Sequence, residues 1–464
     1  MSIAFVYTNL APSVGLAGPD DDVIFAAATG SELAPLLRAA GQRVTLIDDD
    51  PAVLAGHEGV LSSAAVLATP HVQAALAAAG CTAVVPFKTS PRFERLAEML
   101  NLRVLASPAR LVRQLENKLE LPRIAAAAGV IVPDTRVVTF NDELVAEARA
   151  GRIALPAILQ SATGFAGNGT ELVRDPGELA AAVARAARGS VGKLAQVIAG
   201  SPVTVNGCVV GDGPGDVLVG GVTHQLTGIA ECTDAPYGSC GNDWSMPLEQ
   251  ALLQRVREVG AAVGRTIADD GFRGVYGVDA VITDDGDVFL IELNSRITAN
   301  LSLQTELQRL TGGPTLFDAH LAAFGEPHSS SLDELHARFS LDTASPPHPA
   351  AASIVIFHRN GANDVAIHPQ PVDPGAYRLV TGSNGEATLV YLRPAWRFDQ
   401  LEPGSGEFAV LPPAQQRLIT PGSQLARVIT TTQVARDNAS TMLTDEASAI
   451  VQEVRALVTG SKEY

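Results

Sequence analysis

Oxygen ligands suited to a metal ion are concentrated in residues 274–298, GVYGVDAVITDDGDVFLIELNSRIT. Asp279 precedes an acidic turn, and Glu292 and Asn294 follow that turn two residues apart. Two carboxylates and an amide, with no His or Cys among them, favour Mg²⁺ over Zn²⁺. Mg²⁺ that is held by few protein oxygens usually completes its coordination with water and nucleotide phosphate. These residue types therefore predict a magnesium site that also receives a phosphate.

A β-hairpin would bring the three side chains together. The acidic turn at 283–287 is flanked on both sides by apolar, partly β-branched runs, which is typical of two paired strands. Alternation along a strand places Glu292 and Asn294 on one face, and an antiparallel partner can bring Asp279 against them. Arg296 follows two residues later, where its planar cation could grip a phosphoryl or carboxylate oxygen.

Composition limits the kind of partner this chain can have. With 464 residues, 46 % hydrophobic and 18 % charged, the chain should be globular and form about two to four domains. Its formal net charge is −17 and it has no run of Lys and Arg. A nucleic-acid partner is therefore not expected, because such binding depends mainly on phosphate neutralisation. A bound nucleotide would need a local basic pocket.

The sequence also predicts a compartment. No apolar run reaches the ~18 residues of a membrane span, and the start MSIAFVYTNLAPS lacks the basic segment of a signal peptide. We therefore expect a cytoplasmic protein without a membrane partner. Free thiols are expected in that reducing compartment, since the four cysteines form no C-x-x-C pair and have no His at zinc-ligand spacing. They are Cys81, Cys208, Cys232 and Cys240.

The first part of the chain, residues 1–105, alternates strand and helix signals. Helices between strands imply right-handed crossovers and a parallel sheet, so a Rossmann-like domain is predicted. Dinucleotide binding is not expected, because no G-x-G-x-x-G follows the first strand. The strands are expected at 3–7, 43–47 and 81–86, and the helices at 31–40 and 72–79.

Three further blocks separate this domain from the hairpin. Residues 107–128 read as two helices, residues 155–173 as strand, glycine loop and strand, and residues 193–205 as a strand. Glycine lets backbone N–H groups approach phosphate oxygens closely, because no Cβ interferes. The glycines of that loop are Gly164, Gly167 and Gly169.

The hairpin, with Gly-Val-Asp before the turn and Ile-Glu-x-Asn-x-Arg after it, resembles the metal-binding hairpin of the ATP-grasp superfamily of carboxylate ligases. The other blocks follow in the order found in that family, over about residues 106–325. The resemblance implies that Asp279, Glu292 and Asn294 hold metal ions and that Arg296 helps bind the transferred phosphoryl group. ATP and Mg²⁺ are the implied cofactors.

The resemblance also implies how the nucleotide is held. The residue matching Lys118 touches the phosphates, and the glycine loop corresponds to the mobile phosphate loop of the family. In the strand that contacts adenine, Gln196 and Ile198 would use their backbone groups.

Three positions depart from the family pattern. Gln160 stands where a phosphate-binding Lys is usual, and Ala195 and Pro202 replace acidic residues that open the adenine strand and hold the ribose. Ribose recognition would then come from elsewhere, for example from Asn206. If the chain is a working ligase, another cation must replace the missing Lys, and the available ones are Lys118, Lys193 and Arg296.

The predicted fold class is α/β and α+β multidomain. The boundaries are a Rossmann-like domain at 1–105, an ATP-grasp domain at 106–325 with a glycine-loop lobe at 133–193 and a metal-hairpin lobe at 194–325, a linker at 326–351 and a small α+β domain at 352–464. The last domain should contain strands at 352–358, 377–381, 387–392 and 407–411 and a helix at 440–457. Its segment LPPAQQRLITPGSQLARVI resembles the C-terminal domain of pheganomycin-type peptide ligases.

Together the resemblances imply an ATP-dependent ligase that joins a carboxylate to an amine through an acylphosphate, acting on amino acids or peptides in a biosynthetic pathway. Such a chain could form a homodimer. Three alternatives remain open: a biotin-carboxylase-like carboxylase, an ATP-grasp kinase that releases the phosphorylated acid, and a nucleotide-binding module without turnover.

Overall fold

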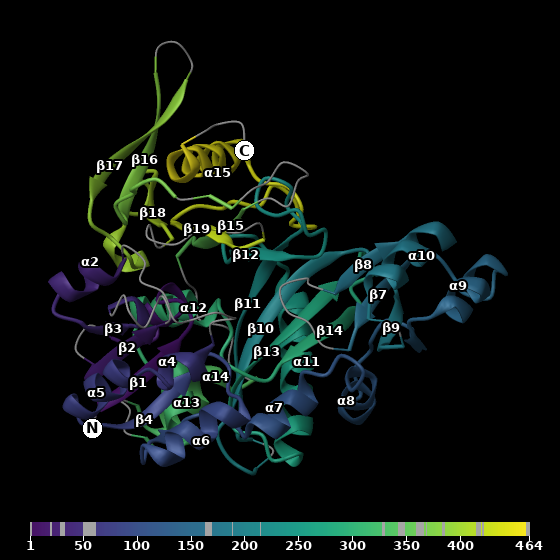
Figure 1. Cartoon of the computed structure of the whole chain (residues 1–464), viewed down its shortest axis with the longest axis horizontal. Helices are drawn as coiled ribbons and strands as arrows, with labels where there is room; N and C mark the ends of the chain where they lie inside the picture. Colours follow the sequence, from purple (N-terminus) through teal and green to yellow (C-terminus); the bar gives the residue numbers. More distant parts are fainter. Residues whose placement is uncertain are drawn as a thin grey trace.

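Three β-sheets organise the chain in this computed structural model (Figure 1). A parallel sheet near the N-terminus lies beside a large antiparallel sheet in the middle, and a small antiparallel sheet projects on the other side of the large one. The residues that the structure describes are 2–18, 21–27, 33–49, 62–162, 169–187, 189–213, 215–326, 330–341, 349–358, 366–367, 369–382, 386–413, 419 and 422–460.

The N-terminal sheet has the strand order β3-β2-β1-β4-β5, and all its pairings are parallel. This confirms the predicted Rossmann-like arrangement. The strand β2, sequence VIFAA, was missed because a short run that is buried on both faces has no alternation to identify it. The elements are β1 (Ser2–Tyr7), α1 (Ala11–Val14), β2 (Val23–Ala27), α2 (Leu33–Ala39), β3 (Arg43–Leu46), η1 (Ile47–Asp49), α4 (Ser63–Leu67), α5 (Pro70–Ala78), β4 (Cys81–Pro86), α6 (Pro91–Met99) and β5 (Arg103–Val104).

Two helices, α7 (Ala109–Leu115) and α8 (Leu121–Ala128), lead to the small sheet, as the sequence predicts. That sheet has the order β6-β9-β7-β8 and is antiparallel throughout. Its two helices bury Leu144 and Leu179 against Leu159 and Leu194 of the strands, which gives this lobe a core of its own. The elements are β6 (Thr135–Thr139), α9 (Asp142–Arg149), β7 (Ala157–Ser161), β8 (Thr170–Val173), α10 (Pro176–Arg185) and β9 (Val191–Gln196).

Among the described residues, the large sheet contains ten strands in the order β14-β13-β10-β11-β12-β15-β19-β18-β16-β17. The long helix α11 packs on one face, where Gly260 and Gly264 allow close approach to Val205 and Tyr276. The other face is covered in part by α12 and α13. The elements from β10 to α13 are β10 (Ser201–Val209), β11 (Val217–Thr227), β12 (Ser239–Asp243), α11 (Gln250–Asp269), β13 (Gly274–Ile282), β14 (Val288–Asn294), α12 (Leu301–Leu310) and α13 (Leu316–Ala323).

The strands of the C-terminal segment belong to this same sheet. β12 pairs with β15, so Asp243 lies opposite Ala352 and the five C-terminal strands continue the sheet. The strand β19 was not among those predicted from the sequence. The domain boundaries stay a prediction. The elements are β15 (Ala352–Phe357), β16 (Gly375–Thr381), β17 (Ala387–Arg393), η2 (Phe398–Gln400), β18 (Glu407–Leu411), β19 (Gln424–Thr430) and α15 (Asp445–Thr459).

The predicted linker at 326–351 is corrected, because it contains the helix α14 (Leu332–Phe339). Ser331 caps the helix and Glu334 bonds back to it, which forms a capping box. Leu335 and Phe339 are fully buried, and the helix packs against β11 of the large sheet and against α13. The Ser- and Pro-rich composition of this stretch concealed the Ser-x-x-Glu signal that starts the helix.

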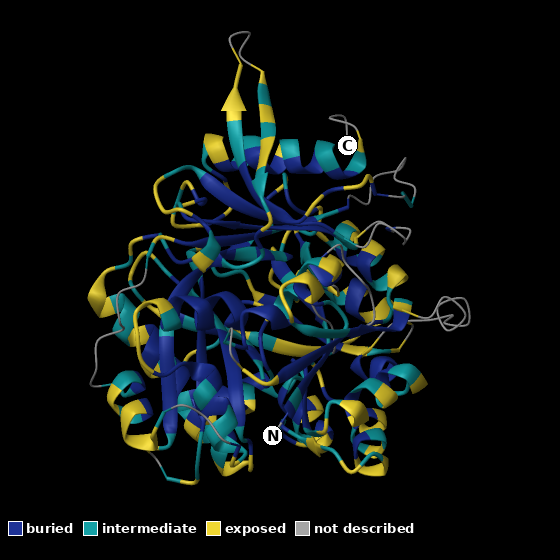
Figure 2. Ribbon diagram, turned by 90° about the vertical axis from the view of Figure 1, so that its left-hand side faces the viewer, coloured by how far each residue is buried: buried dark blue, intermediate teal, exposed yellow. Residues whose placement is uncertain are grey.

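Burial follows the sheets (Figure 2): strands of the N-terminal and large sheets are mostly buried, while the outer end of the β16–β17 hairpin protrudes and is partly exposed. The four cysteines are free thiols, as expected. Within the described ranges, no helix combines the length and the apolar character that crossing a membrane requires.

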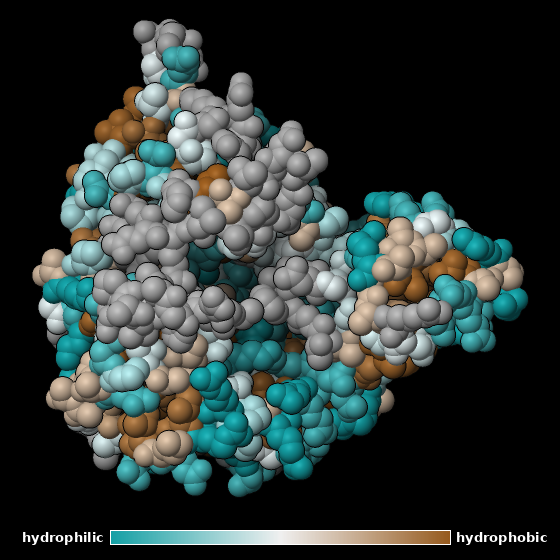
Figure 3. Space-filling model, in the orientation of Figure 1, coloured by the Kyte–Doolittle hydropathy of each residue, from teal (hydrophilic) through white to brown (hydrophobic). Residues whose placement is uncertain are grey.

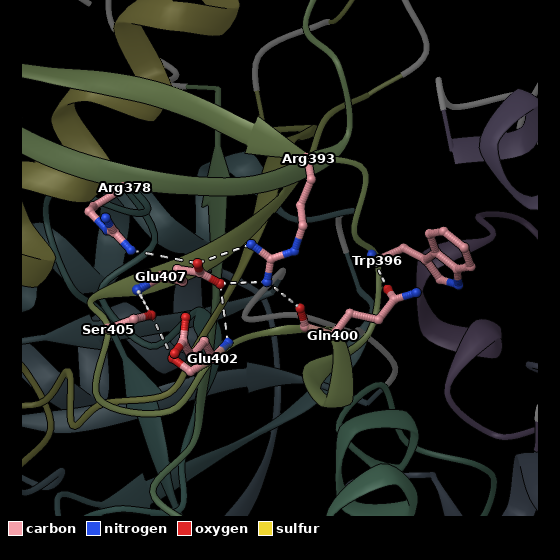
Figure 4. Close-up of polar contacts among 7 residues, drawn as sticks. All are labelled: Arg378, Arg393, Trp396, Gln400, Glu402, Ser405 and Glu407. Atoms are coloured by element: carbon pink, nitrogen blue, oxygen red, sulfur yellow. Dashed lines mark hydrogen bonds and ion pairs between the residues drawn. The ribbon is translucent and has the colours of Figure 1, made fainter.

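A buried carboxylate anchors the C-terminal part of the sheet (Figure 4). Glu407 on β18 is 4 % exposed and accepts two hydrogen bonds from Arg393 on β17, at 3.0 and 2.7 Å. Arg378 on β16 lies 3.6 Å away, and the Glu402 backbone N–H donates at 3.1 Å. The carboxylate of Glu407 thus links β16, β17 and the turn before β18.

Glu407→Gln should lower the free energy of unfolding by about 1–3 kcal/mol, since it removes a charge-assisted pair but keeps the shape. The loss should lie toward the lower end, because water screens the half-exposed arginines. The Arg393 hydrogen bond holds the pKa of Glu407 below its usual value. The difference in unfolding free energy between wild type and Glu407→Gln should therefore persist above about pH 4.3 and shrink as pH falls below it. Urea unfolding measures this, with the exposed Glu402→Gln as a control that should change little.

Candidate functional site

The hairpin brings the three predicted metal ligands together. In the antiparallel pairing of β13 with β14, Asp279 lies opposite Glu292, and Gly277 lies opposite Asn294. Asn294 Nδ2 donates a hydrogen bond of 3.0 Å to Asp279 Oδ2. The register also shifts after Asp279, which marks a bulge next to the site. The structure thus places two carboxylates and one amide side by side, and their metal-binding role stays a prediction.

The charges at this position fit a cation. Burial, followed by the negative charge of Glu292, raises the pKa of Asp279 to about 6. A 2.7 Å hydrogen bond from Thr204 Oγ1, the positive charge of Arg296 and a hydrogen bond from Gln225 act in the opposite direction. Two neighbouring carboxylates repel each other, and a divalent cation between hard oxygen ligands would relieve that repulsion. The residues therefore fit Mg²⁺.

The donor set is short of carboxylates. Across the described ranges, no group of three or more His, Cys, Asp or Glu side chains is arranged to hold a metal. A three-residue metal site at the hairpin therefore needs the amide oxygen of Asn294. Mg²⁺ accepts such a set because it commonly keeps water and phosphate in its remaining positions.

Arg296 is held in place by a network that the sequence analysis did not find. Its NH2 group donates to Asn294 Oδ1 at 2.8 Å, and its Nε lies 2.9 Å from Glu116 Oε1. Its guanidinium stands 5.2 Å from the centre of the Phe87 ring. Lys88, also in the N-terminal domain, pairs with the other oxygen of Glu116 at 2.6 Å. Phe87 and Lys88 directly follow β4, at the carboxyl end of a parallel strand where α/β sheets bind ligands.

Lys118 and Lys193 converge on Glu292. Lys118 Nζ lies 3.9 Å from Glu292 Oε1, and the two lysines are 9 % and 4 % exposed. Burial, and then the charge of Lys118, lower the pKa of Lys193 to about 8, while Glu292 opposes this shift. Lysine occurs four times in the sequence, and three of the four surround this hairpin: Lys88, Lys118 and Lys193. The rarity of lysine in this chain is a signal that sequence reasoning could have used to single out these three residues.

Gln160 lies directly opposite Lys193 in the pairing of β7 with β9. Residues opposite each other in an antiparallel pair have their side chains on the same face. Lys193 therefore supplies a cation beside the position where the family usually has one. Gln160 donates to Thr170 Oγ1 at 3.1 Å, so its amide is occupied within the sheet.

The predicted phosphate loop is described only at its end. Gly164 and Gly167 lie outside the described residues. Gly169 has a φ of +76°, a left-handed conformation that favours glycine, and its carbonyl accepts a hydrogen bond from Ser161 N–H.

The predicted adenine strand at 193–205 is wrong as a single strand. It is split between β9 and β10, which belong to different sheets, and Ile198 lies in the connection. Gln196 ends β9, and its backbone N–H donates to Asp134 O at 2.9 Å. The suggestion that Asn206 recognises ribose also fails. Asn206 is 1 % exposed and bonds to Asn300, Gln304 and Thr298 inside the protein.

One face of the molecule is hollowed. In Figure 3 the centre of the molecule is sunken over the strands of the large sheet, and the visible floor is hydrophilic. The charged residues described above come from separate elements: Glu116 ends α7, Lys193 lies on β9 of the small sheet and Glu292 lies on β14 of the hairpin. The arrangement can hold a metal bound to phosphate and can surround the phosphate with cations.

Comparison with known families agrees with this geometry. Residues 115–300 match the model of a family described as ATP-grasp domain. A search of curated proteins finds no match.

Solved structures show the same fold over almost the whole chain. The biotin carboxylase domain dimer of Hydrogenobacter thermophilus 2-oxoglutarate carboxylase, with MgADP, ADP and bicarbonate, has a TM-score of 0.57 at 16 % identity and covers 93 % of this chain and 86 % of that one. Aspergillus clavatus N5-carboxyaminoimidazole synthase, with ADP and 5-aminoimidazole ribonucleotide, has a TM-score of 0.55 at 14 % identity, with coverage of 97 % and 98 %. Thermotoga maritima phosphoribosylamine–glycine ligase has a TM-score of 0.56 at 12 % identity, with coverage of 99 % and 97 %. The chain therefore has a mixed α/β multidomain fold of the ATP-grasp type, and residues 115–300 match the ATP-grasp domain itself.

Proposed function

We propose that the protein is an ATP-dependent ligase that forms an amide bond between a carboxylate and an amine through an acylphosphate. The observation that carries the proposal is the convergence of Lys118 and Lys193 on a hairpin whose Asp279 and Glu292 are paired side by side. Anionic oxygens for a divalent cation and cations for phosphate meet at one place. This is the combination that phosphoryl transfer requires.

In the first step, an oxygen of the substrate carboxylate attacks the γ-phosphorus of ATP, the bond to the bridging oxygen breaks, and ADP leaves. Mg²⁺ would be held by Asp279, Glu292 and Asn294 and would neutralise phosphate charge. Arg296 is positioned by Glu116 to bind the transferred phosphoryl group, and the two lysines stabilise the remaining phosphate oxygens.

In the second step, the amine attacks the acyl carbon, the bond from that carbon to the phosphate oxygen breaks, and the nitrogen releases a proton to the departing phosphate. The acylphosphate is already activated, so the reaction needs no protein nucleophile. The protein contributes by holding the two substrates in position and by keeping water away from the intermediate.

Amino acids or peptides in a biosynthetic pathway are the proposed substrates. The support for this narrower class is the resemblance of residues 411–429 to pheganomycin-type peptide ligases. A homodimer is the proposed assembly, and the similar domain from H. thermophilus is described as a dimer.

The proposed function is tested by ADP release with ATP, Mg²⁺ and panels of amino acids and peptides, with mass spectrometry to detect the condensed product. Amine-dependent ADP release with a condensed product supports a ligase. ADP release without need of an amine would indicate a kinase, bicarbonate-dependent release a carboxylase, and no release at all a binding module.

Glu292→Gln should lower kcat/KM by at least about 100-fold, because the lost metal charge stabilisation amounts to several kcal/mol. Asp285→Asn, in the exposed turn of the same hairpin, is the matched control and should keep normal turnover. Near-normal turnover of Glu292→Gln would remove the hairpin from the mechanism.

Lys193 should make ATP use depend on pH. Because its pKa is lowered to about 8, the ammonium is charged below that pH and loses its charge as pH rises through it. The KM for ATP should therefore rise between pH 7 and pH 9 in the wild type. Lys193→Arg, which stays charged, should flatten the profile, whereas Lys88→Arg should keep the rise. Identical profiles for wild type and Lys193→Arg would contradict this assignment.

The compensation for Gln160 can be measured directly. Lys118→Ala and Lys193→Ala should each raise the KM for ATP about 10-fold or more, since each removes a charge-assisted contact of roughly 1.5–3 kcal/mol. Gln160→Ala should raise it by about 5-fold or less, a neutral contact being worth about 1 kcal/mol. If instead Gln160→Lys created turnover in an inactive wild type, the chain would be a degenerate binding module.

A further inference from the structure

A buried arginine in the C-terminal part of the sheet has no carboxylate partner among the described residues. Arg427 on β19 is 7 % exposed. Its NH1 group makes two long hydrogen bonds, to Ala299 O at 3.5 Å and to Ser353 Oγ at 3.4 Å, and its Nε has no partner within the described ranges. Burial lowers its pKa to about 10, so the guanidinium stays charged at neutral pH.

Arg427 differs in this respect from other arginines of the same segment. Arg393 is paired with Glu407, and Arg436 is paired with Asp445. Taking a charge out of water is costly unless a partner of opposite charge compensates. A buried guanidinium that keeps free donors is therefore suited to a ligand that brings the negative charge.

The strand register places Arg427 on the same face of the large sheet as the metal hairpin. Asp279 on β13 lies opposite Thr204 on β10, which lies opposite Thr223 on β11. Two residues on, Gln225 lies opposite Asn242 on β12, and Asn242 lies opposite Ser353 on β15. Two residues on again, Val355 lies opposite Arg427. Because residues opposite each other and residues two apart share a face, these side chains form one polar row.

The row runs from the metal hairpin to Arg427. Most members of the row are buried polar side chains, namely Thr204, Thr223, Asn242, Ser353 and Arg427. At the hairpin end, Gln225 bonds to Asp279. The segment that follows the hairpin links the same two places, because Ala299 contacts Arg427 and lies five residues after Asn294. Five residues span at most about 18 Å. A small molecule or short peptide could therefore bridge Arg427 and the metal hairpin.

We propose that Arg427 binds the free carboxylate of the amine substrate, so that the acceptor is an amino acid or short peptide whose amine points toward the hairpin. This inference rests on the proposed ligase function and adds its acceptor specificity. The carboxylate matches the planar donors of the guanidinium, and it supplies the charge that the described residues do not. The product then keeps the carboxylate of the acceptor.

The test measures binding of the twenty common amino acids and of their α-carboxamides to the full chain. The readout is the shift in unfolding temperature as the ligand concentration is raised. At least one amino acid should bind wild type, and its carboxamide should bind at least about 10-fold more weakly. Arg427→Gln should weaken binding of the acid by about 10- to 100-fold without changing binding of the carboxamide. Arg436→Gln, the same change at an exposed pair, should match wild type.

Several results would overturn the proposal: no amino acid binds, the acid and the carboxamide bind wild type equally, or Arg427→Gln binds the acid as wild type does. If Arg427→Gln fails to fold, Arg427→Lys keeps the charge, and the discrimination between acid and carboxamide by wild type still decides. Glu292→Gln should keep acid binding while losing ADP release. Arg427-dependent binding without amine-dependent ADP release from wild type would therefore reject the ligase function and leave the carboxylate site standing.

Discussion

The antiparallel pairing of β13 with β14 imposes the constraint on which the site depends, because it holds Asp279 and Glu292 against each other. Two carboxylates at neighbouring positions of a sheet repel, and burial of Asp279 strengthens the effect by weakening solvation. The surrounding residues offset this charge. Thr204, Asn294 and Gln225 donate hydrogen bonds to Asp279, and Lys118 faces Glu292.

Cations reach the hairpin from separate parts of the fold. Lys118 precedes α8, Lys193 lies on β9 of the small sheet, and Lys88 follows β4 of the parallel sheet. Glu116 connects the parallel sheet with the hairpin segment, because one of its oxygens pairs with Lys88 and the other with Arg296. The position of Arg296 therefore depends on contact between the N-terminal domain and the hairpin.

The replacement of the usual lysine by Gln160 is understandable in this setting. Lys193 lies opposite Gln160 on the neighbouring strand and on the same face, so a positive charge is present although the usual position is neutral. A lysine at both positions would add a third buried ammonium near Lys118. Lys193 already has a pKa lowered to about 8 by burial and by that neighbour, so a further like charge would disfavour the charged form.

The continuous sheet also fixes the position of the C-terminal strands. Through the pairing of β12 with β15, the final strands have a fixed register relative to the metal hairpin. The bidentate contact of Arg393 with Glu407 and the burial of α15 stabilise these strands in place. A side chain on β19 can therefore have a defined position relative to the site.

Local sequence patterns were enough to predict the hairpin and its chemistry. The alternation of residues 274–298 and the turn with Gly286 specify two paired strands, so the proximity of Asp279, Glu292 and Asn294 could be predicted from local physics. The helices α7 and α8 and the strands around the glycine loop were predictable for the same reason.

Which distant residues meet depends on how the elements pack together. Glu116, Phe87 and Lys88 gained their roles from the packing of the parallel sheet against the hairpin, and Arg427 from a strand order that joins β12 to β15. The split of 193–205 between two sheets also depends on partners far away in the chain. Local periodicity reports which face of an element is buried, but it carries no information about which other element covers that face. That choice is made by long-range strand pairing and core packing, whose interacting residues are separated by up to hundreds of positions in this chain.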